Sequence, residues 1–339
     1  MTELPNDLAR IQLLQEPTPL HELPRFASAL RTIAEAEGRR GPSDILMKRE
    51  DLMPLGLGGS KVRNLEYVLG AAALAEATML VATGRPTANH CRLVAAVAAS
   101  RGLSAGLLFW GAPPDRPSVN ERLIRMHGAA VEFSAGGDGA ERARALASFV
   151  RGFEERGERP IVVDDLIRGP VGARGAVRAA LEAGSQVLAR GPMVTHLYCA
   201  VATGGTVAGL SVGLAIHGRP CELVAVPTHL AGAASASVAT AGIEAVRREL
   251  MAAYGSVGTW SEVPLTFDPA SAWEEPEPSA GGRAAAGLLA RTEGVAVDPV
   301  YTARTLAAVI GAARRGDLSG ARVLVWNGGG LPALFDEAE

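Results

Sequence analysis

The stretch Gly56-Leu57-Gly58-Gly59-Ser60-Lys61-Val62-Arg63-Asn64 places a lysine directly after a glycine-rich turn. Lysine is scarce in this chain, because Lys48 and Lys61 are the only two among 33 basic residues and the others are arginine. Arginine stays protonated, whereas a desolvated lysine can lose its proton and attack a carbonyl. We therefore interpret Lys61, whose small neighbours leave its amine room, as a candidate nucleophile. Lys48 lies in a charged run and is equally compatible with a surface position.

The composition of the chain excludes several classes of function. At 339 residues the chain is long enough for two domains or one large one. A net charge of −3 and an aromatic content of 4% offer neither a basic face nor stacking platforms for nucleic acid. No apolar run reaches the ~18 residues that a membrane-spanning helix needs. We therefore expect neither a nucleic acid nor a membrane as partner.

The cysteines and the N-terminus bear on the compartment. Cys91, Cys199 and Cys221 are odd in number and contain no CxxC pair, which favours reduced thiols over disulfides or a metal site. Residues 1–7 lack the basic and apolar regions of a signal peptide. We therefore expect a cytoplasmic protein without a bound metal.

Short apolar runs alternate with helical patterns along most of the chain. The runs that predict strands are 79–82, 103–110, 130–133, 161–163, 194–201, 223–226, 295–297 and 323–326, and a further short apolar segment lies at 45–47. The segments that predict helices are 26–37, 65–72, 89–101, 119–127, 139–156, 173–189, 205–217, 233–254, 283–293 and 303–314. Such alternation is typical of βαβ units. Its two series predict an α/β protein with two open, mostly parallel sheets and a cleft between them.

Residues 259–279 depart from this alternation. The segment holds four prolines, several acidic residues and two tryptophans, and it reads as a long loop that packs as no regular element. Loops of this length often carry function. A solvated acidic surface loop is an equally good interpretation.

A second glycine-rich loop follows a predicted strand. The strand ends at Val201, and Ala202-Thr203-Gly204-Gly205-Thr206 leads directly into a helix. The N–H groups at a helix N-terminus bind phosphate, and glycines let the backbone approach it. Neither this loop nor the Lys61 stretch has the GxxxxGK[ST] or GxGxxG order of nucleotide-binding loops. A phosphate cradle together with a reactive lysine points to pyridoxal phosphate, a phosphorylated aldehyde that lysine holds as a Schiff base.

These motifs, with others along the chain, resemble one group of enzymes. The segments concerned are 48–52, 58–67, Asn89-His90 with 94–99, 203–206, 298–302 and 327–334. They are similar, in content and in order, to the fold-type II pyridoxal phosphate enzymes of the 1-aminocyclopropane-1-carboxylate deaminase and D-cysteine desulfhydrase family. The resemblance covers most of the chain. It implies a fold like that of the tryptophan synthase β subunit, with a large cofactor-binding domain (1–63 and 170–339) and a small domain (64–169) flanking the cofactor.

The resemblance also implies roles for individual residues. Lys61 would hold the cofactor as an imine and later move the substrate proton, and Tyr301 would face the substrate as a second catalytic residue. Asn89 would bind the phenolic oxygen of the cofactor, and Thr302 would lie near its pyridine nitrogen. The remaining cofactor-binding residues would be Ala202, Thr203, Gly204, Gly205, Thr206, Asn327 and Gly328.

The expected substrate wall departs from the family pattern. Thr87-Ala88 stands where the family carries Gln-Ser before Asn-His, and Asn327-Gly328-Gly329-Gly330 replaces His-Thr-Gly-Gly. The substrate-side tyrosine of the family has no match, because its region here contains Glu275. We expect Thr87, Ala88, His90 and Glu275 to line the substrate site. Arg85 and Arg92 are compatible either with a substrate carboxylate or with the surface. A retained cofactor apparatus with a rewritten wall predicts a changed substrate.

The resemblance implies a lyase that acts on a small amino acid. Removal of the Cα proton and elimination of a β-substituent would give an aminoacrylate, and then a 2-oxo acid and ammonia. A threonine rather than a glutamate at 302 leans toward the desulfhydrase side of the family. A β-replacement synthase, a racemase and a catalytically retired ligand-binding homologue stay open as alternatives. Family members are commonly homodimers, so we expect a homodimer.

Overall fold

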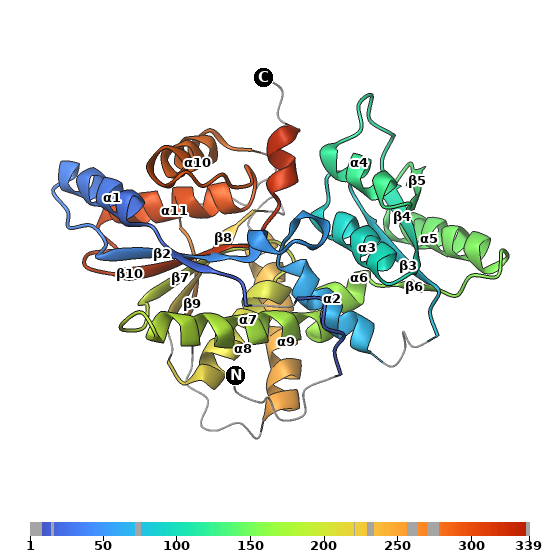
Figure 1. Cartoon of the computed structure of the whole chain (residues 1–339), viewed down its shortest axis with the longest axis horizontal. Coiled ribbons are helices and arrows are strands. Elements are labelled where there is room, and N and C mark those ends of the chain that lie inside the picture. The colour runs from blue at the N-terminus through green and yellow to red at the C-terminus, as the bar shows by residue number, and fades with distance from the viewer. Residues whose placement is uncertain are drawn as a thin grey trace.

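The computed structural model describes residues 9–14, 17–71, 76–219, 221–228, 234–255, 263–269 and 278–336. Two separate sheets organise these residues, as the alternation of strands and helices predicts (Figure 1). Both sheets are dominated by parallel pairs, and helices flank them. None of the described helices is long and apolar enough to cross a membrane.

The larger sheet has six strands in the order β1-β2-β10-β7-β8-β9. Only β1 runs antiparallel to its neighbour β2, and the other pairs are parallel. The last strand of the chain, β10, lies between β2 and β7 and so brings the C-terminal loop beside the Lys61 region. The strands are β1 (Leu20–Glu22), β2 (Asp44–Arg49), β7 (His196–Val201), β8 (Glu222–Pro227), β9 (Leu265–Phe267) and β10 (Arg322–Asn327).

Helices cover both faces of the larger sheet, which explains why inner strands contain continuous apolar runs such as 323–326 in β10. One face carries α1 (Pro24–Ala36), α10 (Ala280–Glu293) and α11 (Thr302–Arg315), and the opposite face carries α7 (Pro170–Leu188), α8 (Gly205–His217) and α9 (Ala234–Tyr254) (Figure 1). The alternation along β10 matches this arrangement. Leu324 packs in the core formed with α7 and α8, whereas Val323 and Val325 pack in the core formed with α1 and α11.

The smaller sheet has four parallel strands in the order β5-β4-β3-β6. Its strands are β3 (Met79–Gly84), β4 (Ser104–Trp110), β5 (Ala130–Ser134) and β6 (Pro160–Val162), and its helices are α3 (Asn89–Ser100), α4 (Val119–Met126) and α5 (Gly139–Glu154). Alternate residues of β3 face opposite layers. Leu80 packs in the core that contains α3, and Met79 and Val81 pack against Phe149 and Phe153 of α5.

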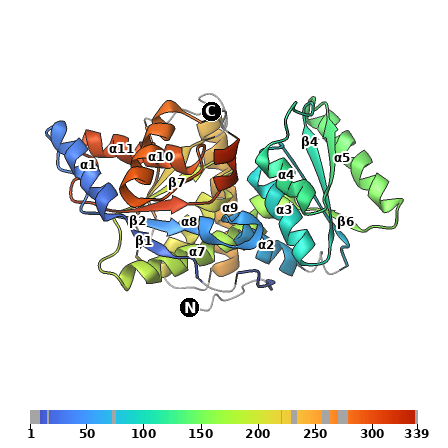
Figure 2. The same cartoon turned by 45° about the horizontal axis from the view of Figure 1, so that its top comes forward.

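Short elements join the two sheets. The turns η1 (Glu50–Leu52) and η2 (Leu55–Leu57) lead from β2 into α2 (Lys61–Gly70), and α6 (Asp164–Arg168) leads from β6 into α7. Figure 2 shows α2 at the junction of the two sheets. It lies very close to α7, because a Cβ added to Gly175 would lie only 2.6 Å from the Arg63 carbonyl oxygen. The final turn, η4 (Leu331–Phe335), reaches the smaller sheet, where Val119 N donates to Asp336 Oδ1 at 2.6 Å.

Most of the predicted elements form, and two expectations are wrong. Residues 295–297 make no strand, because buried Val297 packs among the helices that cover the larger sheet, and an apolar run alone does not distinguish these environments. Within 259–279, Leu265–Phe267 forms the edge strand β9, paired with β8 through Leu223↔Leu265. Strand β9 and its flanking residues 263–264 and 268–269 are described, whereas 259–262 and 270–277, including Glu275, lie outside the described residues.

The division of the strands between the sheets bears on the domain boundaries. The strands of the smaller sheet come from residues 79–162, and those of the larger sheet come from 20–49 and 196–327. We propose that the domains divide at about residues 63 and 170, as the family resemblance implies.

Candidate active site

Lys61 is the first residue of α2, at the junction of the two sheets. Its Nζ donates to Thr206 Oγ1 at 3.4 Å, so the structure brings the candidate nucleophile to the predicted phosphate loop. Burial lowers the pKa of Lys61 to about 8, with Arg168 acting in the same direction and Cys199 opposing. A larger fraction of this amine is therefore neutral near pH 7 than in an ordinary lysine, as a nucleophile requires.

The phosphate loop joins β7 to the N-terminus of α8. Gly204 takes a left-handed conformation with φ of 88°, which favours glycine, and α8 begins at Gly205. Its N-cap residue, Gly204, has no side chain to cap this helix end, and Lys61 Nζ contacts Thr206 in the first turn. A Cβ on Gly205 would lie 2.4 Å from the Arg168 carbonyl oxygen, which packs the loop against α6.

The loop after β10 contacts the glycine-rich stretch that precedes Lys61. Ser60 N donates to the Gly328 carbonyl oxygen at 2.9 Å. A Cβ added to Gly329 would lie 2.5 Å from Gly59 Cα, so the two backbones touch where a side chain would not fit. The position of Lys61 therefore depends on contact between two glycine-rich segments that are far apart in the sequence.

Thr302 and Asn327 meet at the carboxyl end of the larger sheet. Thr302 Oγ1 donates to Asn327 Oδ1 at 3.1 Å, and both side chains are buried. Asp298 caps α11 by accepting hydrogen bonds from Val300 N, Tyr301 N and Thr302 N at 3.1, 2.5 and 2.9 Å. Burial and the neighbouring Asp298 raise the pKa of Tyr301 to about 12, so its phenol is neutral at physiological pH.

Asn89 begins α3, at the carboxyl end of β3. Its Oδ1 accepts from Arg92 Nη1 at 2.8 Å and from Asn120 Nδ2 at 3.0 Å. A Cβ on Gly330 would lie 2.8 Å from Asn89 Nδ2 and 3.2 Å from Asp298 Cβ. Asn89, on a helix that packs against the smaller sheet, thus lies beside segments 298–302 and 327–330, which adjoin the larger sheet.

The remaining predicted site residues lie around the carboxyl end of β3. The Thr87 carbonyl oxygen accepts from Asn120 Nδ2 at 2.7 Å, and Ala88 closes the turn before α3. The His90 ring lies 2.9 Å from the Thr83 carbonyl oxygen and 3.5 Å from Asp164 Oδ1. Asp164 in turn lies 3.7 Å from Arg168, whose charge also reaches Lys61.

Three buried charges went unrecognised in the sequence. Lys48 is fully buried and bonded to Glu182, which excludes the surface interpretation. Arg92 is also fully buried, and it bonds to Asn89 rather than facing solvent. Asp164 of α6 is buried as well; it accepts hydrogen bonds from Thr83 N and Oγ1 and lies 3.5 Å from His90 Nε2. The spacing of Asn89 and Arg92 on one helix face was the available signal for the second of these, since residues three apart are neighbours.

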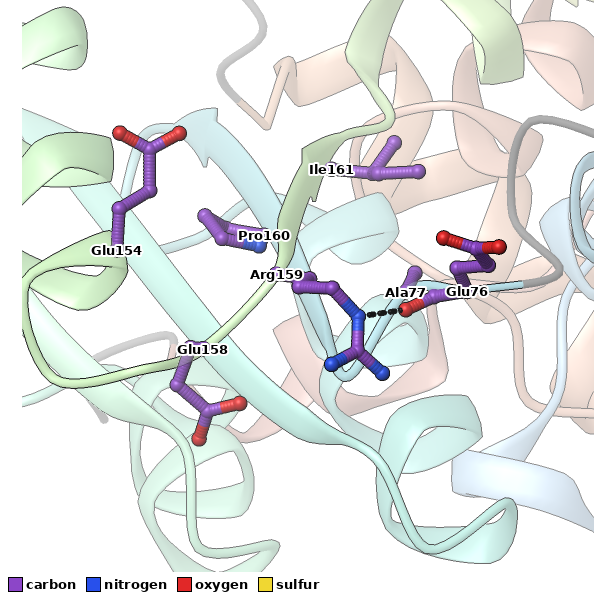
Figure 3. Close-up of a pocket in the computed structure, with 7 residues that line it drawn as sticks. All are labelled: Glu76, Ala77, Glu154, Glu158, Arg159, Pro160 and Ile161. Carbon is purple, nitrogen blue, oxygen red and sulfur yellow. Dashed lines mark hydrogen bonds between the residues drawn. The ribbon is translucent and has the colours of Figure 1, made fainter.

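A hollow of about 350 Å³ lies elsewhere, beside the short strand β6 (Figure 3). Arg159 closes one side by donating to the Glu76 carbonyl oxygen at 2.5 Å. The lining residues are Glu76, Ala77, Glu154, Glu158, Arg159, Pro160 and Ile161. None of them is a predicted site residue. The acidic lining makes the hollow a poor phosphate site, so Lys61 marks the better candidate.

The sequence matches the family described as pyridoxal-phosphate dependent enzyme over residues 11–329. The chain belongs to this family. It is thus a pyridoxal phosphate-dependent enzyme, and the cofactor that the sequence predicts is confirmed.

Individual relatives of this pyridoxal phosphate enzyme span nearly its whole length. It is 32% identical to a D-cysteine desulfhydrase of Klebsiella pneumoniae over 96% of this chain and 95% of the relative. It is 28% identical to a provisionally named 1-aminocyclopropane-1-carboxylate deaminase of Pyrococcus furiosus, over 96% and 93% of the two chains. The crystal structure of an ACC deaminase homologue superposes with a TM-score of 0.78 at 26% identity, over 96% and 93%. These matches confirm the fold-type II resemblance.

The residues of this structure fit the cofactor. A phosphorylated aldehyde needs an amine with a depressed pKa and an anion site within reach of it. Lys61, with a pKa of about 8, and the N-terminus of α8 supply them, joined through Thr206. Lys61 would hold the aldehyde carbon, and Thr203 to Thr206 would hold the phosphate.

Proposed function

We propose that this enzyme removes the Cα proton of a small amino acid and eliminates its β-substituent, releasing a 2-oxo acid and ammonia. The observation that carries the proposal is the contact of half-buried Lys61 with Thr206, at the N-terminus of α8. When bound there, pyridoxal phosphate supplies a carbonyl that condenses with amines and a conjugated ring that accepts electrons. The relative named D-cysteine desulfhydrase supports a thiol as the leaving group.

Lys61 would act as the base that takes the Cα proton. Its pKa of about 8 supports this role, because a base works best when its pKa lies near the operating pH. Tyr301, with a pKa of about 12, keeps its proton at neutral pH and would serve as a hydrogen-bond donor toward the substrate rather than as a base. The two side chains therefore divide the acid and base work by their environments.

The surroundings of Thr302 support elimination. A hydroxyl cannot keep a pyridine nitrogen protonated as a carboxylate could. Asp298, the nearest carboxylate along the chain, is occupied by three backbone N–H groups at the start of α11. A ring without that proton is a weaker electron acceptor. Rapid loss of a β-leaving group after proton removal suits such a ring.

A panel of substrates separates this reaction from its rivals. Both enantiomers of cysteine, serine and O-acetylserine would be assayed for the 2-oxo acid and ammonia, with and without an added thiol. We expect 2-oxo acid formation to dominate. Inversion of the substrate enantiomer would instead identify a racemase, and a thioether product would identify a β-replacement synthase.

The Lys61→Ala variant tests whether Lys61 holds the cofactor and is needed for turnover. Purified wild-type protein with added pyridoxal phosphate should show visible absorbance and turn over at least one substrate, and the variant should lose both. An Arg25→Ala variant, in which an exposed side chain is shortened, is the matched control and should keep both. A wild-type protein that binds the cofactor without any turnover would overturn the proposal and favour a retired homologue.

A further inference from the structure

Arg92 is a buried cation whose hydrogen bonds all end on neutral oxygens. The residue is fully buried, and it donates to the carbonyl oxygens of Gly56 and Gly58 and to the side-chain oxygens of Asn89 and Asn120. No salt bridge in the described part of the chain includes it. Burial without a counter-charge lowers the pKa of Arg92 to about 10. Burying such a charge is costly, so its retention calls for a role.

The hydrogen bonds from Arg92 to Asn89 and Asn120 determine the orientation of these two side-chain amides. Arginine only donates, so the Asn120 atom 2.7 Å from Arg92 Nη1 must be Oδ1, and Asn120 Nδ2 must then face the Thr87 carbonyl oxygen and Asn89. Asn89 therefore receives two donors on one atom, which must be its oxygen. Its NH2 group is left to face the loop at Gly330, at the junction of the two sheets.

The hydrogen bonds from Arg92 to the carbonyl oxygens of Gly56 and Gly58 hold the turn before Lys61. Arg92 Nε donates to Gly56 O at 2.8 Å, and Nη2 donates to Gly58 O at 2.9 Å. Gly56 and Gly58 both have positive φ values, of 57° and 75°, so this turn adopts a backbone that favours glycine. One guanidinium thus joins the start of α3 to the loop that carries the cofactor lysine.

We propose that Arg92 is a positioning residue for the cofactor. It turns the NH2 group of Asn89 toward the phenolic oxygen of pyridoxal phosphate and keeps the turn before Lys61 in register with that group. The inference rests on the role toward the phenolic oxygen that the family resemblance implies for Asn89, and not on the choice among elimination, replacement and racemisation. A planar fork of five donors can reach four oxygens at once, which a lysine ammonium cannot do.

The charge of Arg92 adds a consequence for the bound cofactor. Arg92 donates to Asn89 and would, through Asn89, stabilise negative charge on the phenolic oxygen of the bound cofactor. That charge affects the electronic transition of the bound cofactor. The visible absorption band is therefore a readout that a merely structural arginine would leave in place.

The test uses pyridoxal phosphate itself with the variants Arg92→Gln, Asn89→Ala and the double variant. The dissociation constant and the position of the visible band would be measured for each. We expect Arg92→Gln to weaken cofactor binding about tenfold, equivalent to ~1.4 kcal/mol, and to shift the band. Arg92→Lys should not restore either property. In the Asn89→Ala background, adding Arg92→Gln should shift the band no further, because Arg92 acts through Asn89.

Arg322→Gln is the matched control. Arg322 is nearly buried and donates to the backbone carbonyl oxygens of Pro192 and Arg190. It begins β10, whereas Asn327, at the candidate site, ends that strand. The Arg322→Gln variant should be less stable than the wild type but should keep the visible absorption band and the affinity for pyridoxal phosphate. An unshifted band in Arg92→Gln, or an equal shift with and without Asn89, would overturn the proposal. If Arg92→Gln does not fold, Asn120→Leu, which removes the second donor to Asn89, takes its place with the same criteria.

Discussion

Lys48 Nζ donates to Glu182 Oε1 at 2.5 Å, in a cluster that is almost closed to solvent. Arg63 bridges the same carboxylate to Glu50, with Nε 2.7 Å from Glu50 Oε2 and Nη2 2.9 Å from Glu182 Oε1. Thr18 completes the cluster by donating to Glu50 Oε1 at 2.6 Å. Two cations balance two carboxylates, and Arg63 lies two residues after Lys61. The cluster therefore fixes the start of α2 against β2 and α7.

We predict that Lys48→Met lowers the free energy of unfolding by about 3 kcal/mol, because it leaves one buried carboxylate uncompensated. Urea unfolding measures the change. Arg25→Ala, which removes the exposed arginine of the pair with Glu293, is the control and should cost less than about 1 kcal/mol. Equal losses in the two variants would show that the Lys48 cluster contributes no more than a surface pair.

The rate of cofactor loading should depend on pH. The neutral form of Lys61 is the reactive one, and the pKa of its amine is lowered to about 8 by burial. We expect the rate of colour development, after pyridoxal phosphate is added to cofactor-free protein, to rise with pH through a midpoint near 8. Stopped-flow absorbance measures it. A midpoint near the ordinary lysine value, above pH 10, would mean that the amine is solvated before the cofactor binds.

His90 should make stability depend on alkaline pH. Burial alone would lower its pKa, but the interactions of the ring with Cys91 and Asp164 outweigh burial and raise the pKa of His90 to about 10. The charged ring therefore stabilises the fold fully below about pH 6.5, and this contribution disappears as the pH rises through 10.

We predict that the excess stability of the wild type over His90→Gln falls by at least about 1 kcal/mol between pH 6.5 and 10. Thermal or urea unfolding across this range measures the difference. Parallel stability profiles for the two proteins would contradict a charged His90. Asp164→Asn should flatten the wild-type profile in the same range, because it removes the partner carboxylate.

Gly329→Ala should disturb the active site through the backbone. The added Cβ would meet Gly59 Cα at 2.5 Å, so one of the two loops must move and carry Lys61 with it. We expect a stability loss of about 1–3 kcal/mol beyond that of the control and clearly weaker cofactor binding. Gly294→Ala is the control, since Gly294 also has a positive φ, of 69°, but has open space around its Cβ position. Equal effects would assign the cost to backbone conformation alone.

Local pattern was sufficient to predict much of the fold and part of the site. The apolar strands, the glycine-rich turn before Lys61 and the strand–loop–helix at 201–206 are each contained within about ten residues. Their physics is local, because strand period, helix initiation and glycine conformation depend on neighbouring residues. The structure confirms the α/β architecture and brings Lys61 to Thr206 as these motifs predict.

The tertiary structure alone decided which charges are buried and what they contact. A hydropathy pattern does not tell a surface lysine from Lys48, whose partners Thr18 and Glu182 come from other segments. It also does not show that Arg92 joins Asn89 to the turn before Lys61. The free energy of a buried charge depends on oxygens that packing brings together from distant parts of the chain. The sequence by itself therefore determined that Lys61 and the 202–206 loop are the candidates for holding the cofactor, and packing decided how that lysine is held.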